Sequence, residues 1–228
     1  MVRILSVALI CSLTAVVAVL PAIAAGPLPS VVQVIFEQEH TRSLAAGTVI
    51  EYRFQRTVSD ERLLGAPYSD EIKVDVKGEL AAGNRTVGIA IFTGERGRYL
   101  SYPDLTINPL INFYLDRSVH SFSQIAGGDP FYLKGRFKAA FLDGAAVEPV
   151  EVDYAGKKVP GYRIAMTPFA KDAMATRMQG YEGSSFAMTL SEAVPGQVVE
   201  LVAVLASTQK DAPRLEERIT FAGTGRAK

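Results

Sequence analysis

The stretch IEYRFQRTV, residues 50–58, decides the fold. Its large apolar side chains stand at every second position, and charged or polar residues fill the positions between them. A period of two is typical of a strand with one buried and one solvated face. Arg56 stands in the apolar series as its one charged member. The stretch predicts a long strand whose apolar side faces a core.

The same alternation recurs on both sides of a polar loop that contains Gly65 and Pro67. Residues 71–77, EIKVDVK, repeat it, and shorter apolar stretches follow at 87–91 and 99–102. Four strands with short connections predict an antiparallel meander. Later in the chain, five more β-type stretches bring the total to about nine strands, near residues 148–154, 158–166, 185–191, 197–206 and 214–222.

The middle of the chain has a helical period instead. Asn108-Pro109 is a helix cap followed by proline at the first helical position, and Asp129-Pro130 repeats this start signal. The apolar residues after each start fall on one helical face, with Leu133, Phe137 and Phe141 four apart. A two-helix insert is expected over about residues 108–143. Thr167-Pro168 predicts the start of a third, short helix that reaches Met178.

An antiparallel sheet of about nine strands with one apolar face must cover that face, and two or three short helices are too few to cover it if it is flat. The pattern therefore favours an α+β fold, a strongly curved antiparallel sheet, or incomplete β-barrel, wrapped around the helical insert. This arrangement resembles the periplasmic lipoprotein-carrier proteins. The resemblance implies an apolar cavity under the helices. The likeness is one of architecture and assigns no residue. It is equally close to exported bacterial proteins of this size without an assigned activity.

The N-terminus has the features of a secretory signal. Arg3 precedes the apolar run from Ile4 to Leu20, Pro21 breaks it, and Ala22-Ile23-Ala24 gives the small residues that signal peptidase reads. We expect residues 1–24 to be cleaved near Ala24, leaving one β-rich domain over residues 28–223 in the periplasm, with no stable membrane span. Cleavage also removes Cys11, the sole cysteine.

Charge and composition exclude several function classes. Without Arg3, the 24 basic residues become 23, against 24 acidic ones, and no basic stripe appears, so a nucleic-acid partner is not expected. With two histidines and no cysteine left, a thiolate or multi-histidine metal site is excluded, and neither a metal nor a cofactor is expected. No motif of nucleophilic or phosphate-transfer chemistry is present.

The two histidines are interpreted as surface or capping residues. His120 has Asp116 and Ser118 close by on its own helix, but their spacing does not bring both to one edge of the imidazole. His40 follows Glu37-Gln38-Glu39 and is interpreted in the same way. An acid pair such as Glu148 and Glu151 is most simply explained as solvent-facing strand charges. No catalytic residue is assigned, and an enzyme is the less favoured interpretation.

The helical insert is rich in large aromatic residues, more than one helix stripe requires. If they line a cavity under the helices, that cavity would suit an acyl chain or another apolar ligand. The alternative is that they pack against one another and fill the core. The candidate cavity residues are Phe113, Tyr114, Phe122, Phe131, Tyr132, Phe137 and Phe141.

Three hypotheses follow. The first is a non-catalytic periplasmic protein that binds a lipid-like or other apolar ligand. The second is an envelope interaction or assembly protein with a filled core, with the apolar run Val198 to Leu205 as an edge strand open to a protein partner. The third is a hydrolase built on carboxylates or His120.

Overall fold

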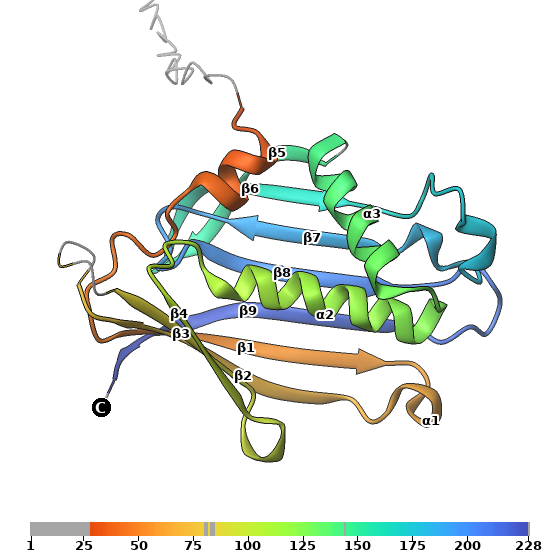
Figure 1. Cartoon of the computed structure of the whole chain (residues 1–228), viewed down its shortest axis with the longest axis horizontal. Coiled ribbons are helices and arrows are strands. Elements are labelled where there is room, and N and C mark those ends of the chain that lie inside the picture. Colours follow the sequence, from red (N-terminus) through yellow and green to blue (C-terminus); the bar gives the residue numbers. More distant parts are fainter. Residues whose placement is uncertain (1–27, 80–81, 83–84, 144, 228) are drawn as a thin grey trace, which may run out of the picture.

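The computed structural model describes residues 28–79, 82, 85–143 and 145–227. Figure 1 shows the sheet with its helices on one side. In chain order the elements are η1 (Gln33–Glu37), β1 (Thr48–Val58), α1 (Glu61–Leu64), β2 (Tyr68–Lys77), β3 (Thr86–Ile91), η3 (Gly94–Arg96), β4 (Arg98–Pro103), α2 (Pro109–Ala126), α3 (Pro130–Asp143), β5 (Ala146–Tyr154), β6 (Lys157–Met166), η4 (Ala175–Arg177), η5 (Tyr181–Gly183), β7 (Ser185–Leu190), β8 (Val198–Leu205) and β9 (Leu215–Arg226).

All nine strands form one antiparallel sheet in the order β4-β3-β2-β1-β9-β8-β7-β6-β5. Consecutive strands pair throughout except for β4 and β5, which form the two edges, and β9 returns to pair with β1 and thereby joins the two halves of the sheet. The sheet does not close, and both of its edges contribute to the core, Tyr102 from β4 and Val147 from β5. The predicted α+β fold with an incomplete barrel is confirmed.

The strand proposed as an open edge lies inside the sheet. β8 pairs with β7 on one side and with β9 on the other. The expectation that Val198 to Leu205 forms the margin is therefore wrong, because the long return of β9 to β1 puts the margins at β4 and β5. An apolar run shows that a strand is buried, and it does not show where the strand stands in the sheet.

The alternation read in residues 50–58 is the burial pattern of β1. Ile50, Tyr52 and Phe54 are at most 1% exposed and face the helices. Arg56 continues this inward series and is also buried. The same face of β2 carries Ile72, Val74 and Val76, as the sequence predicts.

The helical layer consists of α2 and α3, with η1 beside them (Figure 1). α2 begins after Asn108 and α3 buries Leu133, Phe137 and Phe141, in agreement with the predicted caps and spacing. The predicted third helix is wrong: residues 167–178 form turns and the three-residue η4. Fully buried Phe169 packs between Phe122 and Phe186, with ring centroids 4.0 and 6.4 Å away, and this packing holds the segment in turns.

The expected signal peptide, residues 1–24, lies outside the described residues. From residue 28 onward, in the segments that the structure describes, no helix has both the length and the apolar character that crossing a membrane requires.

Candidate ligand-binding groove

A groove of about 670 Å³ lies where η1, the end of β4, α2 and α3 meet. Its size falls within the ~300–1,000 Å³ of typical small-molecule sites. Two thirds of the twelve lining residues are apolar. They are Val32, Phe36, Tyr102, Leu115, Val119, Phe137, Phe141 and Leu142, and the polar ones are Asn112, Asp116, Lys134 and Lys138.

The first half of α2 is fixed to the sheet by its cap residue. Asn108 is fully buried, and its side-chain oxygen accepts a hydrogen bond from the amide of Leu110 at 3.0 Å. Its side-chain nitrogen donates to the hydroxyl of Tyr52 at 2.8 Å and to the carbonyl of Gly196 at 2.9 Å. All three bonds are made away from water, so one amide sets both the start of α2 and its position over β1.

His40 connects η1 to the same point. Its Nδ1 accepts a hydrogen bond from the Asn108 amide at 3.2 Å, so Nε2 carries the proton and donates to the carbonyl of Val34 at 2.8 Å. The residue is fully buried, and the expectation of a surface histidine is wrong here. Burial lowers the pKa of the imidazole, although the bond to the Val34 carbonyl acts in the opposite direction. His40 thus holds the groove wall formed by η1 against the start of α2.

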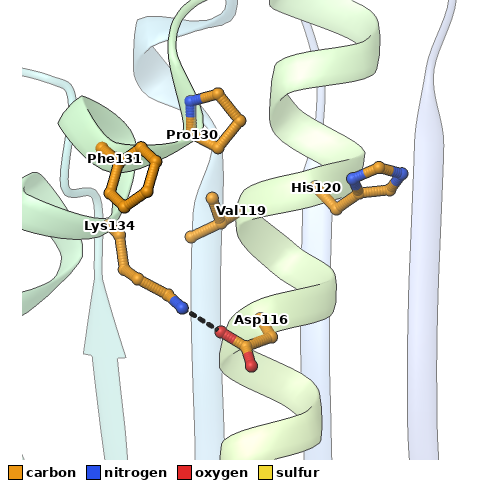
Figure 2. A pocket seen from close by; sticks show the side chains of 6 residues that line it. All are labelled: Asp116, Val119, His120, Pro130, Phe131 and Lys134. Atoms are coloured by element: carbon orange, nitrogen blue, oxygen red, sulfur yellow. Dashed lines mark ion pairs between the residues drawn. The ribbon is translucent and has the colours of Figure 1, made fainter.

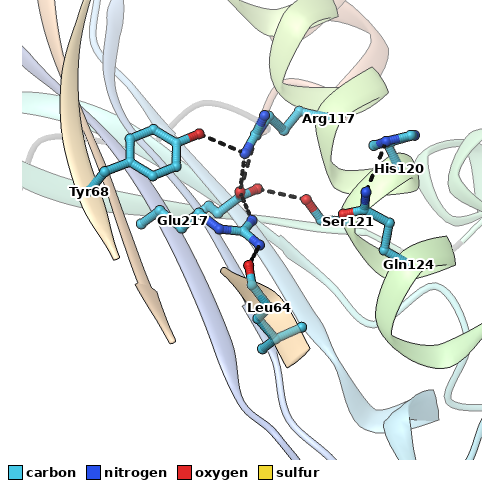
Figure 3. Close-up of polar contacts among 8 residues, drawn as sticks. Leu64, Tyr68, Arg117, His120, Ser121, Gln124 and Glu217 are labelled. Carbon is cyan, nitrogen blue, oxygen red and sulfur yellow. Dashed lines mark hydrogen bonds and ion pairs between the residues drawn. The ribbon is translucent and has the colours of Figure 1, made fainter. Parts of the chain in front are cut away.

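The second half of α2 is fixed by a buried carboxylate (Figure 3). Glu217 of β9 is 4% exposed and accepts hydrogen bonds from Arg56 at 2.5 Å, from Arg117 at 2.6 Å and from Ser121 at 3.0 Å. Arg117 also donates to the hydroxyl of Tyr68 at 3.1 Å. Ionic hydrogen bonds of this kind fix orientation as well as position. Arg117 and Ser121 belong to α2, so the cluster joins the floor of the groove to β1 and β9.

Sequence reasoning did not identify this charge cluster. The signal was present, because Arg56 and Glu217 each occupy an inward position in an otherwise apolar alternation. The two residues are direct partners in the β1 to β9 register, and a charge on the inward face requires a partner of opposite sign.

The wall formed by α3 consists of residues three and four positions apart, which share one helix face. Phe137 and Phe141 are buried at its base, whereas Leu142 is 60% exposed at the rim. Phe36 of η1 is 40% exposed and packs edge to face against this wall, with its ring centroid 6.1 Å from that of Phe141. Exposed apolar residues around a hollow mark a surface that can bury more area on binding.

An ion pair bounds the groove at its other end. The carboxylate of Asp116 on α2 contacts the ammonium of Lys134 on α3 at 2.6 Å. Beyond it lies a smaller pocket of about 180 Å³ that also contains His120, Pro130 and Phe131 (Figure 2). Asp116, Val119 and Lys134 line both hollows, so the ion pair stands at the boundary between them.

The aromatic residues named from the sequence do not share one environment. Phe137 and Phe141 line the groove, Phe131 is 86% exposed at the smaller pocket, and Tyr132 lines a separate hollow of about 410 Å³ with Met174 and Met178. Tyr114 and Phe122 are buried against the sheet, where Tyr114 donates to the carbonyl of Val202 at 2.7 Å.

Phe113 packs edge-on against Phe92 with centroids 5.8 Å apart. The groove also contains apolar residues that were not among the candidates from the sequence, namely Val32, Phe36, Tyr102, Leu115, Val119 and Leu142. They come from four separate elements, and no local pattern connects them.

The residues considered for hydrolysis do not converge. His120 is exposed, and its ring nitrogen lies 3.3 Å from the amide of Gln124 (Figure 3). Asp116 is held by Lys134, and Ser118 is buried. Glu148 and Glu151 are exposed and point to opposite faces of β5, since their spacing is odd. Among the described residues, no group of three or more histidine, cysteine or acidic side chains is arranged to hold a metal ion.

Comparison with known proteins finds likeness of structure only. No family model matches the sequence, and no curated protein matches it. A chain in the Pseudomonas aeruginosa MucA/MucB complex is 15% identical with a TM-score of 0.38; the match covers 83% of this chain, which spans 54% of that one. Mycobacterium tuberculosis lipoprotein LppX is 8% identical over 84% of this chain and 92% of that one, with a TM-score of 0.32.

A LolA superfamily protein from Nitrosomonas europaea is 8% identical over 88% of this chain and 95% of that one, with a TM-score of 0.23. A LolA superfamily protein is thus among the structures that this chain resembles in overall architecture, at low similarity. Because the likeness concerns architecture, the ligand of this chain has to follow from its own residues.

Proposed function

We propose that this protein is exported to the periplasm, where it binds a lipid-like ligand without catalysing a reaction. The groove carries the proposal: it is about 670 Å³ in volume, two thirds of its lining residues are apolar, and Phe36 and Leu142 stand half in water at its rim. An acyl chain laid between them would remove this apolar surface from water, which is the main source of affinity for such a ligand.

The walls of the groove are held in place before a ligand binds. Its floor is α2, which the Asn108 hydrogen bonds hold at one end and the Glu217 cluster at the other. The η1 wall is held by His40. A site whose walls are fixed before binding does not have to spend binding free energy on ordering them.

A matched pair of substitutions tests the proposal. Leu142→Ser removes a rim side chain that is 60% exposed, and Leu63→Ser removes one that is 70% exposed on α1, outside the groove. Covering the exposed part of one leucine is worth roughly 1–2 kcal/mol, or about five- to thirty-fold in affinity. In a titration with the fluorescent apolar probe N-phenylnaphthylamine, Leu142→Ser should weaken binding by this factor and Leu63→Ser should leave it unchanged.

A second measurement identifies the natural ligand. Organic extracts of protein purified from its native envelope are compared by mass spectrometry with extracts of protein refolded from denaturant. A stoichiometric lipid-like species in the native sample alone is expected. If neither sample holds one and the two leucine variants bind the probe equally, the binding proposal is wrong.

An envelope interaction protein remains the second candidate. The observation that favours it is the edge strand β4, where Tyr99 and Leu100 are 48% and 47% exposed. An exposed, partly apolar edge can accept a strand from a partner. A Leu100→Lys variant that loses a partner captured by the unmodified protein would support this function.

A further inference from the structure

Three of the four polar residues of the groove, Asp116, Lys134 and Lys138, lie near one another. Along α3 the lining residues are Lys134, Phe137, Lys138, Phe141 and Leu142, so the last turn of this wall is apolar, and the two lysines, with Phe137 between them, precede it. Asp116 on α2 joins the charged end through its ion pair with Lys134. Phe36 and Val32 of the η1 segment join the apolar end. The charged side chains are therefore concentrated toward one end of the groove, called the polar end below, although Val119 and Phe137 also line that part.

The charges at the polar end do not cancel. Asp116 is matched by Lys134 at 2.6 Å. Lys138, one helical turn further along α3, forms no ion pair with any residue in the described part of the chain. One positive charge beside an apolar trough is left to interact with a ligand, and it favours a ligand that carries the opposite charge next to an apolar chain.

We propose that the ligand is a single-chain amphiphile with an anionic headgroup, an inference that rests on the proposed lipid-binding function. The chain lies along the apolar end, over the packed rings of Phe36 and Phe141, and the headgroup binds Lys138 at the polar end. Asp116 repels the headgroup, but its own charge is engaged by Lys134. One trough of about 670 Å³ with one free cation matches one chain with one anionic head.

The experiment measures displacement of N-phenylnaphthylamine by three amphiphiles of equal chain length, each below its micellar limit. Myristate carries a carboxylate, tetradecyl phosphate carries a phosphate, and tetradecanol is uncharged. Lys138→Gln removes the free charge. The control variant, Lys157→Gln, makes the same change at an exposed lysine of β6 that does not line the groove.

The unmodified protein should bind the anionic probes more tightly than tetradecanol. Lys138→Gln should weaken anion binding by about two- to five-fold, the effect of one solvent-screened ion pair, and leave tetradecanol unchanged. Lys157→Gln should affect neither. Added salt should reduce the preference for anions in the unmodified protein and in Lys157→Gln, but not in Lys138→Gln. The stronger of the two anionic probes identifies the headgroup chemistry.

Two results would overturn the inference in distinguishable ways. If tetradecanol displaces the dye as well as the anions do, or Lys138→Gln changes all three equally, the ligand is not selected by charge and lipid binding stands without it. If none of the three amphiphiles displaces the dye, both the anionic ligand and the proposed function are wrong.

Discussion

Replacing Glu217 by glutamine should destabilise the protein far more than any surface substitution. The carboxylate is 4% exposed and accepts hydrogen bonds from Arg56, Arg117 and Ser121. Glutamine has almost the same shape, so the change removes the negative charge with little effect on packing. Arg117 is 25% exposed and can turn partly to water. Arg56, 8% exposed, stays in the core, where the Leu64 carbonyl and the new amide oxygen are neutral acceptors that do not balance its charge.

An uncompensated buried charge costs about 3–5 kcal/mol of unfolding free energy. Glu216, the next residue, provides the matched control, because it faces the other side of β9 and pairs with Arg214 and Arg218, which are 56% and 36% exposed. Exposed pairs of this kind contribute about 0.2–1 kcal/mol, so Glu216→Gln should cost no more than that.

Urea unfolding followed by circular dichroism separates the two variants. At an m-value of about 2 kcal/mol/M, Glu217→Gln should lower the unfolding midpoint by about 1.5–2.5 M and Glu216→Gln by less than about 0.5 M. Adding Arg56→Met to Glu217→Gln should recover part of the loss, because the buried cation is then gone. Equal costs for the two glutamine variants would refute the reasoning, since burial would then make no difference to the charge.

Three further substitutions test the supports of the groove. Burial lowers the pKa of His40 below its ordinary ~6.5. Between the lowered pKa and the ordinary one the unfolded chain binds more protons than the folded chain, so stability should fall as pH drops through this window and stay flat above it. His40→Gln should remove this slope in urea titrations, and an unchanged slope would assign it to other groups. Asn108→Ala should cost about 2–4 kcal/mol in the same assay, because it removes a helix cap and leaves buried partners unsatisfied, and a loss below about 1 kcal/mol would contradict the role given to this amide. Gly196 has φ +72°, and a Cβ added there would lie 2.4 Å from Ile50, so Gly196→Ala should cost more than about 1 kcal/mol of stability. Gly183 has open space around it, and Gly183→Ala should be near neutral in thermal unfolding. Similar melting temperatures for both variants would show that the turn at Gly196 can relax.

The regular elements were predictable because their signals are local. The two-residue period of residues 50–58 and 71–77 becomes β1 and β2, and the caps at Asn108 and Asp129 begin α2 and α3. These patterns depend on side-chain direction along one segment, which the backbone geometry fixes. Where a local signal competed with packing, it lost: Thr167-Pro168 has the form of a helix start, but burial of Phe169 decided the conformation.

Strand order and the groove required the tertiary structure. The apolar character of Val198 to Leu205 shows burial, but its place between β7 and β9 depends on the return of β9 to β1. Arg56 and Glu217, 161 residues apart, were visible as charges in apolar series, and only strand register makes them partners.

The sequence by itself determined the nine strands, the two helices and the incomplete barrel, because periodicity and caps are properties of neighbouring residues. The tertiary structure alone decided that η1, β4, α2 and α3 meet in one groove, where Phe36 packs against Phe141 and Lys138 has no ion pair with any described residue. The physical reason is that a binding surface is made of residues brought together by packing, and the free energy of that packing is summed over the whole chain.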